Sequence, residues 1–372
     1  MIRETIAFGV ALLGLAVPGW AETPGPAELA DLPPNEWVVF HEDESLEWRR
    51  QGHGGAAYDS KRGTLLLFGS NSHGSDWDNS VHEFDPAAKR WTTHYPPADP
   101  STYRADATGK RIAGPEGRIM PWAMHTYDSV LYDPRLDALV MTSVSSHTKP
   151  KHPVPGATGD PVWIYDLTDR EWRIFDSGGE RAPTVFASAS AYDAGRDTLM
   201  VYGGNGGGTS GMFELGPDRK RWQRVARAHH EIHFNMDYDA RNGTLAVFGD
   251  YGNSNKVWIY TPHPTPGRKG RWEERVPEGE CPRDQSFPVA YDKRAGLFLL
   301  MPRGVTCVYD PDANRYAILP DAKIRPDEEA EDMNYNMVYD ERHDVFLLVT
   351  GTWRAPARVW ALRLDPGALQ GP

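Results

Sequence analysis

The sequence predicts an all-β propeller of six four-stranded blades, and three features of the chain support this prediction. A tyrosine–aspartate pair recurs six times, each time followed by a polar turn and a short apolar run. A second segment, which ends in an aromatic residue, follows five of the six copies. The copies are spaced by 46 to 74 residues, which is typical of propeller blades that bury their faces by stacking side by side.

Each repeat contains the elements of one blade in order. The first strand ends in the Tyr-Asp pair, and the apolar run after the polar turn forms the second strand. A third strand, an acidic turn and a fourth strand complete an antiparallel meander. The pairs begin at Tyr58, Tyr132, Tyr192, Tyr238, Tyr291 and Tyr339. The fourth strands carry Trp91, Trp172, Trp222, Trp272 and, in the fifth unit, Tyr316.

The two ends of the chain predict how the ring closes. The last unit stops before any strand with a closing tryptophan, whereas the N-terminal segment offers a strand that ends at Trp48. We therefore predict that this segment supplies the outer strand of the last blade, which leaves no free edge. A seventh blade, built from the N-terminal hairpin and part of residues 92–123, is the alternative.

The repeat resembles the kelch repeat. The resemblance rests on the Tyr-Asp-Pro turn, on the closing tryptophan and on an apolar strand that ends in Gly-Gly, most clearly at Tyr202, Gly203 and Gly204. It covers roughly residues 37–366. It implies a kelch-like β-propeller but does not specify an activity, because propellers host many unrelated functions.

Residues 1–21 predict a secretory signal peptide, since one arginine precedes a short apolar stretch and the small residues Gly19 and Ala21. A lone N-terminal membrane anchor is the alternative. A linker (22–36), one propeller domain (37–366) and a tail (367–372) follow, and we expect a secreted or periplasmic monomer. The formal net charge of −12 argues against nucleic acid and anionic membranes as partners.

The two cysteines, Cys281 and Cys307, both lie in the fifth unit. In an oxidising compartment they could form a disulfide between the entry of the inner strand and the third strand. Two buried thiols are the alternative, because cysteine is often a core residue.

The repeat register assigns the loops to two faces. The turns after the Tyr-Asp pairs and before the tryptophans are short and alike, so they form one structural face. The loops after the second strands and between blades vary, and variable loops on a rigid scaffold usually carry function. On inner strands, five residues before the tyrosines, we expect His53, Tyr127 and His233 to face the pore, with His125 beside Tyr127 by strand alternation. The other predicted residues of this rim are His147, Asn205, Arg303, Tyr335, Trp353 and Arg354.

These residue types suit β-elimination on a uronate, which needs a cation, a base and an acid. We expect His125 or His147 to be the base, Tyr127 the acid, and Arg303 or Arg354 the cation. Two histidines one hairpin apart, on adjacent strands, resemble the ulvan lyase propellers, in which a histidine pair, tyrosine and arginine serve this reaction. The resemblance implies a polysaccharide lyase acting on an acidic polysaccharide or oligosaccharide. From their places on the rim we expect His53, His233, Asn205, Tyr335 and Trp353 to be further substrate-binding residues.

Other functions remain open at this point. The chain also resembles the sialic acid mutarotases, which open and close a sugar ring. A non-catalytic module that binds glycan or protein is the next alternative, with Trp77, Trp122, Tyr251 and Trp353 as exposed aromatic residues. Copper chemistry of the galactose oxidase type is disfavoured, because no cysteine lies where a Tyr-Cys crosslink is expected.

Metal binding has only weak support in the sequence. His229, His230, Glu231 and His233 could form a ligand cluster, but a histidine-rich loop is usually just solvated. Asp76 and Asp78 lack the further oxygens of a defined calcium loop. We therefore expect no cofactor, and leave a structural calcium ion open.

Overall fold

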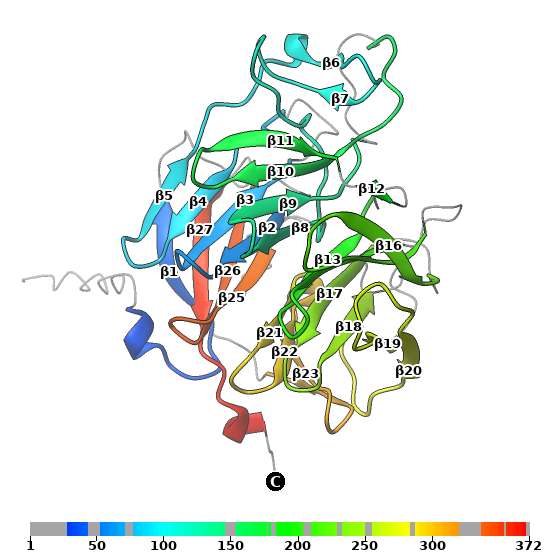
Figure 1. The fold of residues 1–372 in the computed structure, drawn as a ribbon. Helices are drawn as coiled ribbons and strands as arrows, with labels where there is room; N and C mark the ends of the chain where they lie inside the picture. Colours follow the sequence, from blue (N-terminus) through cyan, green and yellow to red (C-terminus); the bar gives the residue numbers. More distant parts are fainter. Residues whose placement is uncertain are drawn as a thin grey trace, which may run out of the picture.

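The computed structural model has six antiparallel four-stranded sheets arranged in a ring (Figure 1). It describes residues 28–43, 53–70, 77–145, 154–176, 178–179, 184–203, 210–228, 233–249, 255–282, 287–319, 336–352 and 355–369. Successive innermost strands contact one another all the way round, and the last contacts the first. The predicted six-bladed all-β propeller is confirmed.

Each blade runs from an inner to an outer strand. Blade 1 contains β2 (Gly55–Asp59), β3 (Thr64–Phe68), β4 (His82–Asp85) and β5 (Arg90–Thr93). Blade 2 contains β8 (Val130–Asp133), β9 (Ala138–Met141), β10 (Val162–Asp166) and β11 (Glu171–Phe175). Blade 3 contains β13 (Ala189–Asp193), β14 (Thr198–Gly203), β15 (Gly211–Leu215) and β16 (Arg221–Ala226), with β12 (Gly178–Gly179) added in parallel to β16.

Blade 4 contains β17 (Phe234–Asp239), β18 (Thr244–Gly249), β19 (Val257–Thr261) and β20 (Arg271–Arg275). Blade 5 contains β21 (Val289–Asp292), β22 (Leu297–Leu300), β23 (Cys307–Asp310) and β24 (Arg315–Ile318). Blade 6 contains β25 (Asn336–Asp340), β26 (Val345–Thr352) and β27 (Ala355–Leu362). Every Tyr-Asp pair therefore ends an inner strand, as predicted.

The N-terminal strand closes the ring, as the sequence predicts. Strand β1 (Val38–Asp43) pairs antiparallel with β27 and becomes the outer strand of blade 6. In Figure 1 the blue β1 lies in the same sheet as the red β27. Leu29 and Leu32, just before this strand, are buried in the same core cluster as Phe40. The predicted end of the strand at Trp48 lies outside the described residues.

The segment between blades 1 and 2 forms a small projection and not a seventh blade. It contains the 3₁₀ turn η2 (Pro100–Thr102) and the two-stranded hairpin of β6 (Arg104–Ala105) and β7 (Arg111–Ile112), at the top of Figure 1. Tyr103 stacks on Trp122, with ring centroids 5.1 Å apart. The segment therefore packs through its own aromatic side chains and adds no sheet to the ring.

The Tyr-Asp pair has a structural role that explains its repetition. Oδ1 of Asp59 accepts the backbone N–H groups of Lys61 and Arg62, both at 2.9 Å, which fixes the turn into the second strand. The aspartates of the other five pairs cap their turns in the same way: Asp133, Asp193, Asp239, Asp292 and Asp340. We call the face that carries these turns the repeat face, and the opposite one the loop face.

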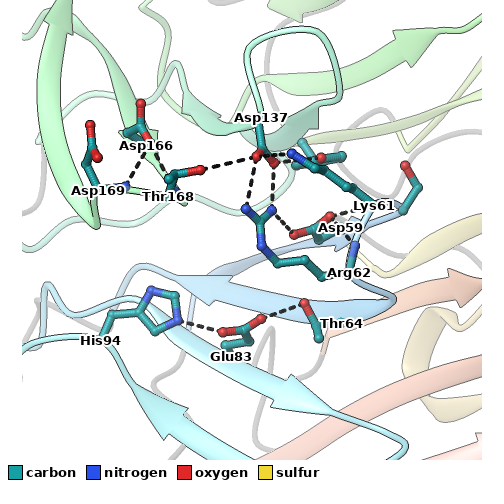
Figure 2. A network of polar contacts seen from close by, with 12 residues as sticks. Asp59, Lys61, Arg62, Thr64, Glu83, His94, Asp137, Asp166, Thr168 and Asp169 are labelled. Atoms are coloured by element: carbon teal, nitrogen blue, oxygen red, sulfur yellow. Dashed lines mark hydrogen bonds and ion pairs between the residues drawn. The ribbon is translucent and has the colours of Figure 1, made fainter.

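Charged side chains also join neighbouring blades across the repeat face. Figure 2 shows Arg62 of blade 1 between the carboxylates of Asp59, at 2.7 Å, and Asp137 of blade 2, at 2.6 Å. The Arg62 guanidinium holds the pKa of Asp137 well below its usual range. The repeat face is therefore occupied by interactions that stabilise the ring.

The described cysteines are paired. Cys281 and Cys307 form a disulfide with their Cα atoms 6.0 Å apart, which ties the segment before blade 5 to the start of β23. Among the described residues, no helix has the length and apolarity that a membrane span requires.

Candidate functional site

Four equivalent residues on the loop face have left-handed backbone conformations. They stand five residues before the tyrosines of blades 1 to 4: His53 (φ 61°), Tyr127 (φ 46°), Ala187 (φ 50°) and His233 (φ 67°). This region is uncommon for residues other than glycine, and such strain often marks functional sites. All four lie just ahead of the inner strands, so the predicted place of His53, Tyr127 and His233 on those strands is wrong.

Backbone hydrogen bonds between blades hold this unusual conformation. The carbonyl of His53 accepts the N–H of Tyr127 at 3.1 Å. The carbonyl of Ala187 likewise accepts the N–H of His233 at 3.2 Å. Each carbonyl therefore anchors the equivalent residue of the next blade, and this arrangement fixes where the side chains leave the backbone.

The side chains at these positions meet in one group, the His–Tyr cluster, formed by His53, His125, Tyr127, Phe186 and His233. Nδ1 of His125 lies 3.1 Å from the Tyr127 hydroxyl, and the His53 ring stacks on His125 at 4.3 Å. The His233 ring meets the Tyr127 ring edge-on at 5.2 Å. The phenol of Tyr127 is thus in contact with all three imidazoles.

Phe186 completes the cluster and was not predicted. Its ring lies 5.5 Å from that of Tyr127 and 5.7 Å from that of His233. The sequence signal was its place directly before Ala187, which occupies the repeat position of His53, Tyr127 and His233. Phe186 thus forms an aromatic wall beside Tyr127 and His233.

The contact between His125 and Tyr127 has a different origin from the one expected. His125 lies five residues before β8, so it is not on an inner strand, and strand alternation does not place it. The left-handed turn at Tyr127 brings the phenol back towards the imidazole. The side chain of His125 is buried, and its carbonyl accepts the Ser143 hydroxyl at 2.6 Å. The expected hairpin partner, His147, lies outside the described residues.

Several other predicted residues lie outside the described part of the chain. For Arg303 only the backbone is described, in the 3₁₀ turn η4 (Pro302–Gly304). Outside the described residues are Asn205, Tyr335, Trp353 and Arg354, together with Tyr251, Asp76, His229, His230 and Glu231. Trp122, expected to be an exposed ligand-binding residue, is instead buried and donates to the Ile112 carbonyl at 2.8 Å.

The described residues contain no group of three or more His, Cys, Asp or Glu side chains suited to a metal ion. Asp78, one of the two residues considered for calcium, accepts hydrogen bonds from the Ser80 backbone at 2.7 Å and pairs with His82 at 3.0 Å. Its carboxylate is therefore held by protein groups.

Two chambers lie along the axis of the ring beneath the cluster. The repeat-side chamber, of about 210 Å³, is bounded by residues from all six inner strands. The loop-side chamber, of about 40 Å³, has Gly54 and Tyr127 in its wall, so it adjoins the His–Tyr cluster. Asp128 belongs to the walls of both chambers.

Two acidic side chains face this axis, and the sequence analysis did not select either. Burial is the main cause that raises the pKa of Asp128 well above its ordinary value, and the nearby Asp237 adds to the effect. Burial also raises the pKa of Asp237 to about 6. Both residues keep some exposure, and both line the repeat-side chamber. Burial therefore disfavours the charged form of Asp128.

Comparisons with known proteins support the fold. No protein-family model matches the chain. No curated protein matches it either. Among the solved structures 562 chains match, and one entitled "Structure of YjhT" has a TM-score of 0.52 over 86% of this chain and 95% of that chain. At 9% sequence identity this likeness concerns the fold alone. The fold is that of a kelch-like six-bladed β-propeller.

Proposed function

We propose that this protein is a carbohydrate-active enzyme that performs acid–base catalysis on an acidic sugar at the loop face. The observation that carries the proposal is the pairing of His125 Nδ1 with the Tyr127 hydroxyl at 3.1 Å, with the His53 ring stacked behind it. Imidazole accepts and releases protons near neutral pH, and a hydrogen-bonded phenol can relay a proton to or from it.

Opening and closing of a sugar ring is the reaction that these groups suit best. The step needs one group to take the proton of the anomeric hydroxyl and another to protonate the ring oxygen as the bond between the anomeric carbon and the ring oxygen breaks. Closing reverses both transfers, so no other reactant is consumed. We assign the base to His125 and the acid to Tyr127, with His53 and His233 as walls of the sugar site.

β-Elimination on a uronate is the second candidate. It uses the same base and acid, but it also needs a cation to neutralise the carboxylate as the adjacent proton leaves. The repeat register favours Arg303 and Arg354 for that role, because it places both at the ends of second strands. Ring opening comes first because the described cluster already contains the groups that it requires.

The proposed partner is an acidic mono-, oligo- or polysaccharide met outside the cytoplasm by a monomeric protein. The Cys281–Cys307 disulfide supports export, because such bonds persist in oxidising compartments. The acidic net charge of −12 offers no general attraction for an acidic sugar, so recognition must come from local groups on the loop face.

The test measures anomer interconversion by NMR for reducing acidic sugars, and in parallel the ultraviolet absorbance of unsaturated uronates for acidic polysaccharides. Tyr127→Phe keeps the ring but removes the hydroxyl, so we expect a loss of about 100-fold or more in turnover. Tyr192→Phe makes the same change on the repeat face and should leave turnover unchanged. Saturable binding without turnover of any sugar would identify a binding module and overturn the enzymatic proposal.

A further inference from the structure

The loop-side chamber has a mixed lining that suits a small polar ligand. Phe287, Val289 and Met337 supply apolar surface, while Asn235 and Asp128 supply polar groups. Tyr127 of the His–Tyr cluster is also part of the wall. A group that enters this chamber would therefore lie directly under the groups proposed to act on the sugar.

Among the described residues that line this chamber, Asn235 has a side-chain donor whose hydrogen-bonding capacity is not met by any other described residue. Its side chain is only 5% exposed, and its Nδ2 has no hydrogen-bond partner among the residues that the structure describes. Buried amide groups normally have partners, so an exception calls for a bound group. An amide N–H₂ is a donor, and its natural partner is an oxygen acceptor.

The neighbouring polar groups limit the charge of that acceptor. The Nδ2 of Asn336 already donates to the Gly54 carbonyl at 2.9 Å. Oδ2 of Asp128 accepts the N–H of Met236 at 2.9 Å, and the Asp237 carboxyl lies close enough to influence it. The described residues that line this chamber include no Lys, Arg or His side chain to balance the charge of an anion, whereas an uncharged oxygen needs no counter-charge.

We propose that the loop-side chamber binds an uncharged oxygen acceptor, the hydroxyl or acyl oxygen of a sugar seated on the His–Tyr cluster, and that Asn235 is its donor. This inference rests on the proposed function, because it names a part of the substrate of the same site. It implies selectivity, since a buried donor rejects an analogue that lacks the oxygen. The volume of about 40 Å³ limits the entering group to a few atoms.

The first experiment tests the chamber without a sugar. Full-length protein labelled with ¹⁵N-asparagine is titrated with formamide, a small uncharged acyl oxygen acceptor. The Asn235 side-chain signal, assigned by its loss in Asn235→Leu, should shift saturably, while that of Asn242 on the repeat face should not. An unmoved Asn235 signal would overturn the inference, because the chamber would then hold water only.

The second experiment uses whichever acidic sugar the anomer assay identifies. Asn235→Leu should weaken its binding about 10-fold, the usual consequence of losing one buried hydrogen bond, and Asn242→Leu should leave it unchanged. Turnover with unchanged affinity in Asn235→Leu would refute the inference but leave the proposed function intact. If formamide shifts the Asn235 signal but the protein turns over no sugar in the assays, the result would support a ligand site and refute the proposed function.

Discussion

The hydroxyl of Tyr58 donates a 2.6 Å hydrogen bond to Oδ1 of Asp340 and so joins the first blade to the last. Tyr291 makes the same bond to Asp239 of the preceding blade at 2.7 Å. The aspartate of the pair caps its own turn, and in these two cases it also receives the tyrosine of the next blade. At these two seams the aspartate therefore both fixes its own turn and joins two neighbouring blades.

Tyr58→Phe should lower the free energy of unfolding by about 1 kcal/mol, because it removes one hydrogen bond to a buried carboxylate. Urea unfolding followed by tryptophan fluorescence measures the change. Tyr316→Phe is the control, since its hydroxyl has no hydrogen-bond partner among the described side chains. Equal losses in both variants would show that the bond at the ring closure contributes nothing specific.

The pKa of Asp237, raised to about 6, predicts a pH-dependent stability. A carboxyl whose pKa is higher in the folded state than in the unfolded state stabilises the folded protein. This contribution is fully present below the pKa of the unfolded state, near 4, and is lost as the pH rises through 6. The expected loss is ~2–3 kcal/mol between pH 4 and pH 7. The difference in unfolding free energy between the wild type and Asp237→Asn isolates the contribution of this carboxyl. A difference that is constant with pH would contradict the raised pKa of Asp237.

The sequence predicted the ring and its closure because both depend on local, repeated patterns. Each Tyr-Asp pair caps its own turn, so a short window of sequence contains its cause. The position of His125 was harder to predict, because it depends on a left-handed turn at Tyr127 that the bonds between blades hold in place. Asp237 did leave a signal, since it is acidic where the other five repeats have Ala, Leu, Ala, Ala and Val before the tyrosine.

Loss of the Cys281–Cys307 disulfide should destabilise the protein by ~3 kcal/mol, because the bond closes a loop with a sequence separation of 26. The double variant Cys281→Ala, Cys307→Ala measures this change by urea unfolding. Dithiothreitol should lower the midpoint of the wild type towards that of the variant and leave the variant unchanged. A wild type that is insensitive to complete reduction would show that the bond adds no stability.

Replacement of His125 separates catalysis from packing. The side chain is 1% exposed and stacked on His53, so His125→Ala would leave a void as well as remove the base. His125→Gln keeps most of the volume, and we expect it to abolish turnover while the melting temperature stays close to that of the wild type. Retained turnover in a folded His125→Gln protein would exclude His125 as the base.

The closing tryptophans should contribute to the free energy of unfolding in proportion to their burial. The Trp172 side chain is buried, packs against Phe68 at 4.9 Å and Tyr165 at 5.0 Å, and donates to the Tyr95 hydroxyl. Trp172→Ala should therefore cost ~3–5 kcal/mol. Trp272 occupies the same position in blade 4 but is only half-buried, so Trp272→Ala should cost clearly less. Equal losses of unfolding free energy in the two variants would mean that the repeat position, and not burial between blades, determines what this tryptophan contributes.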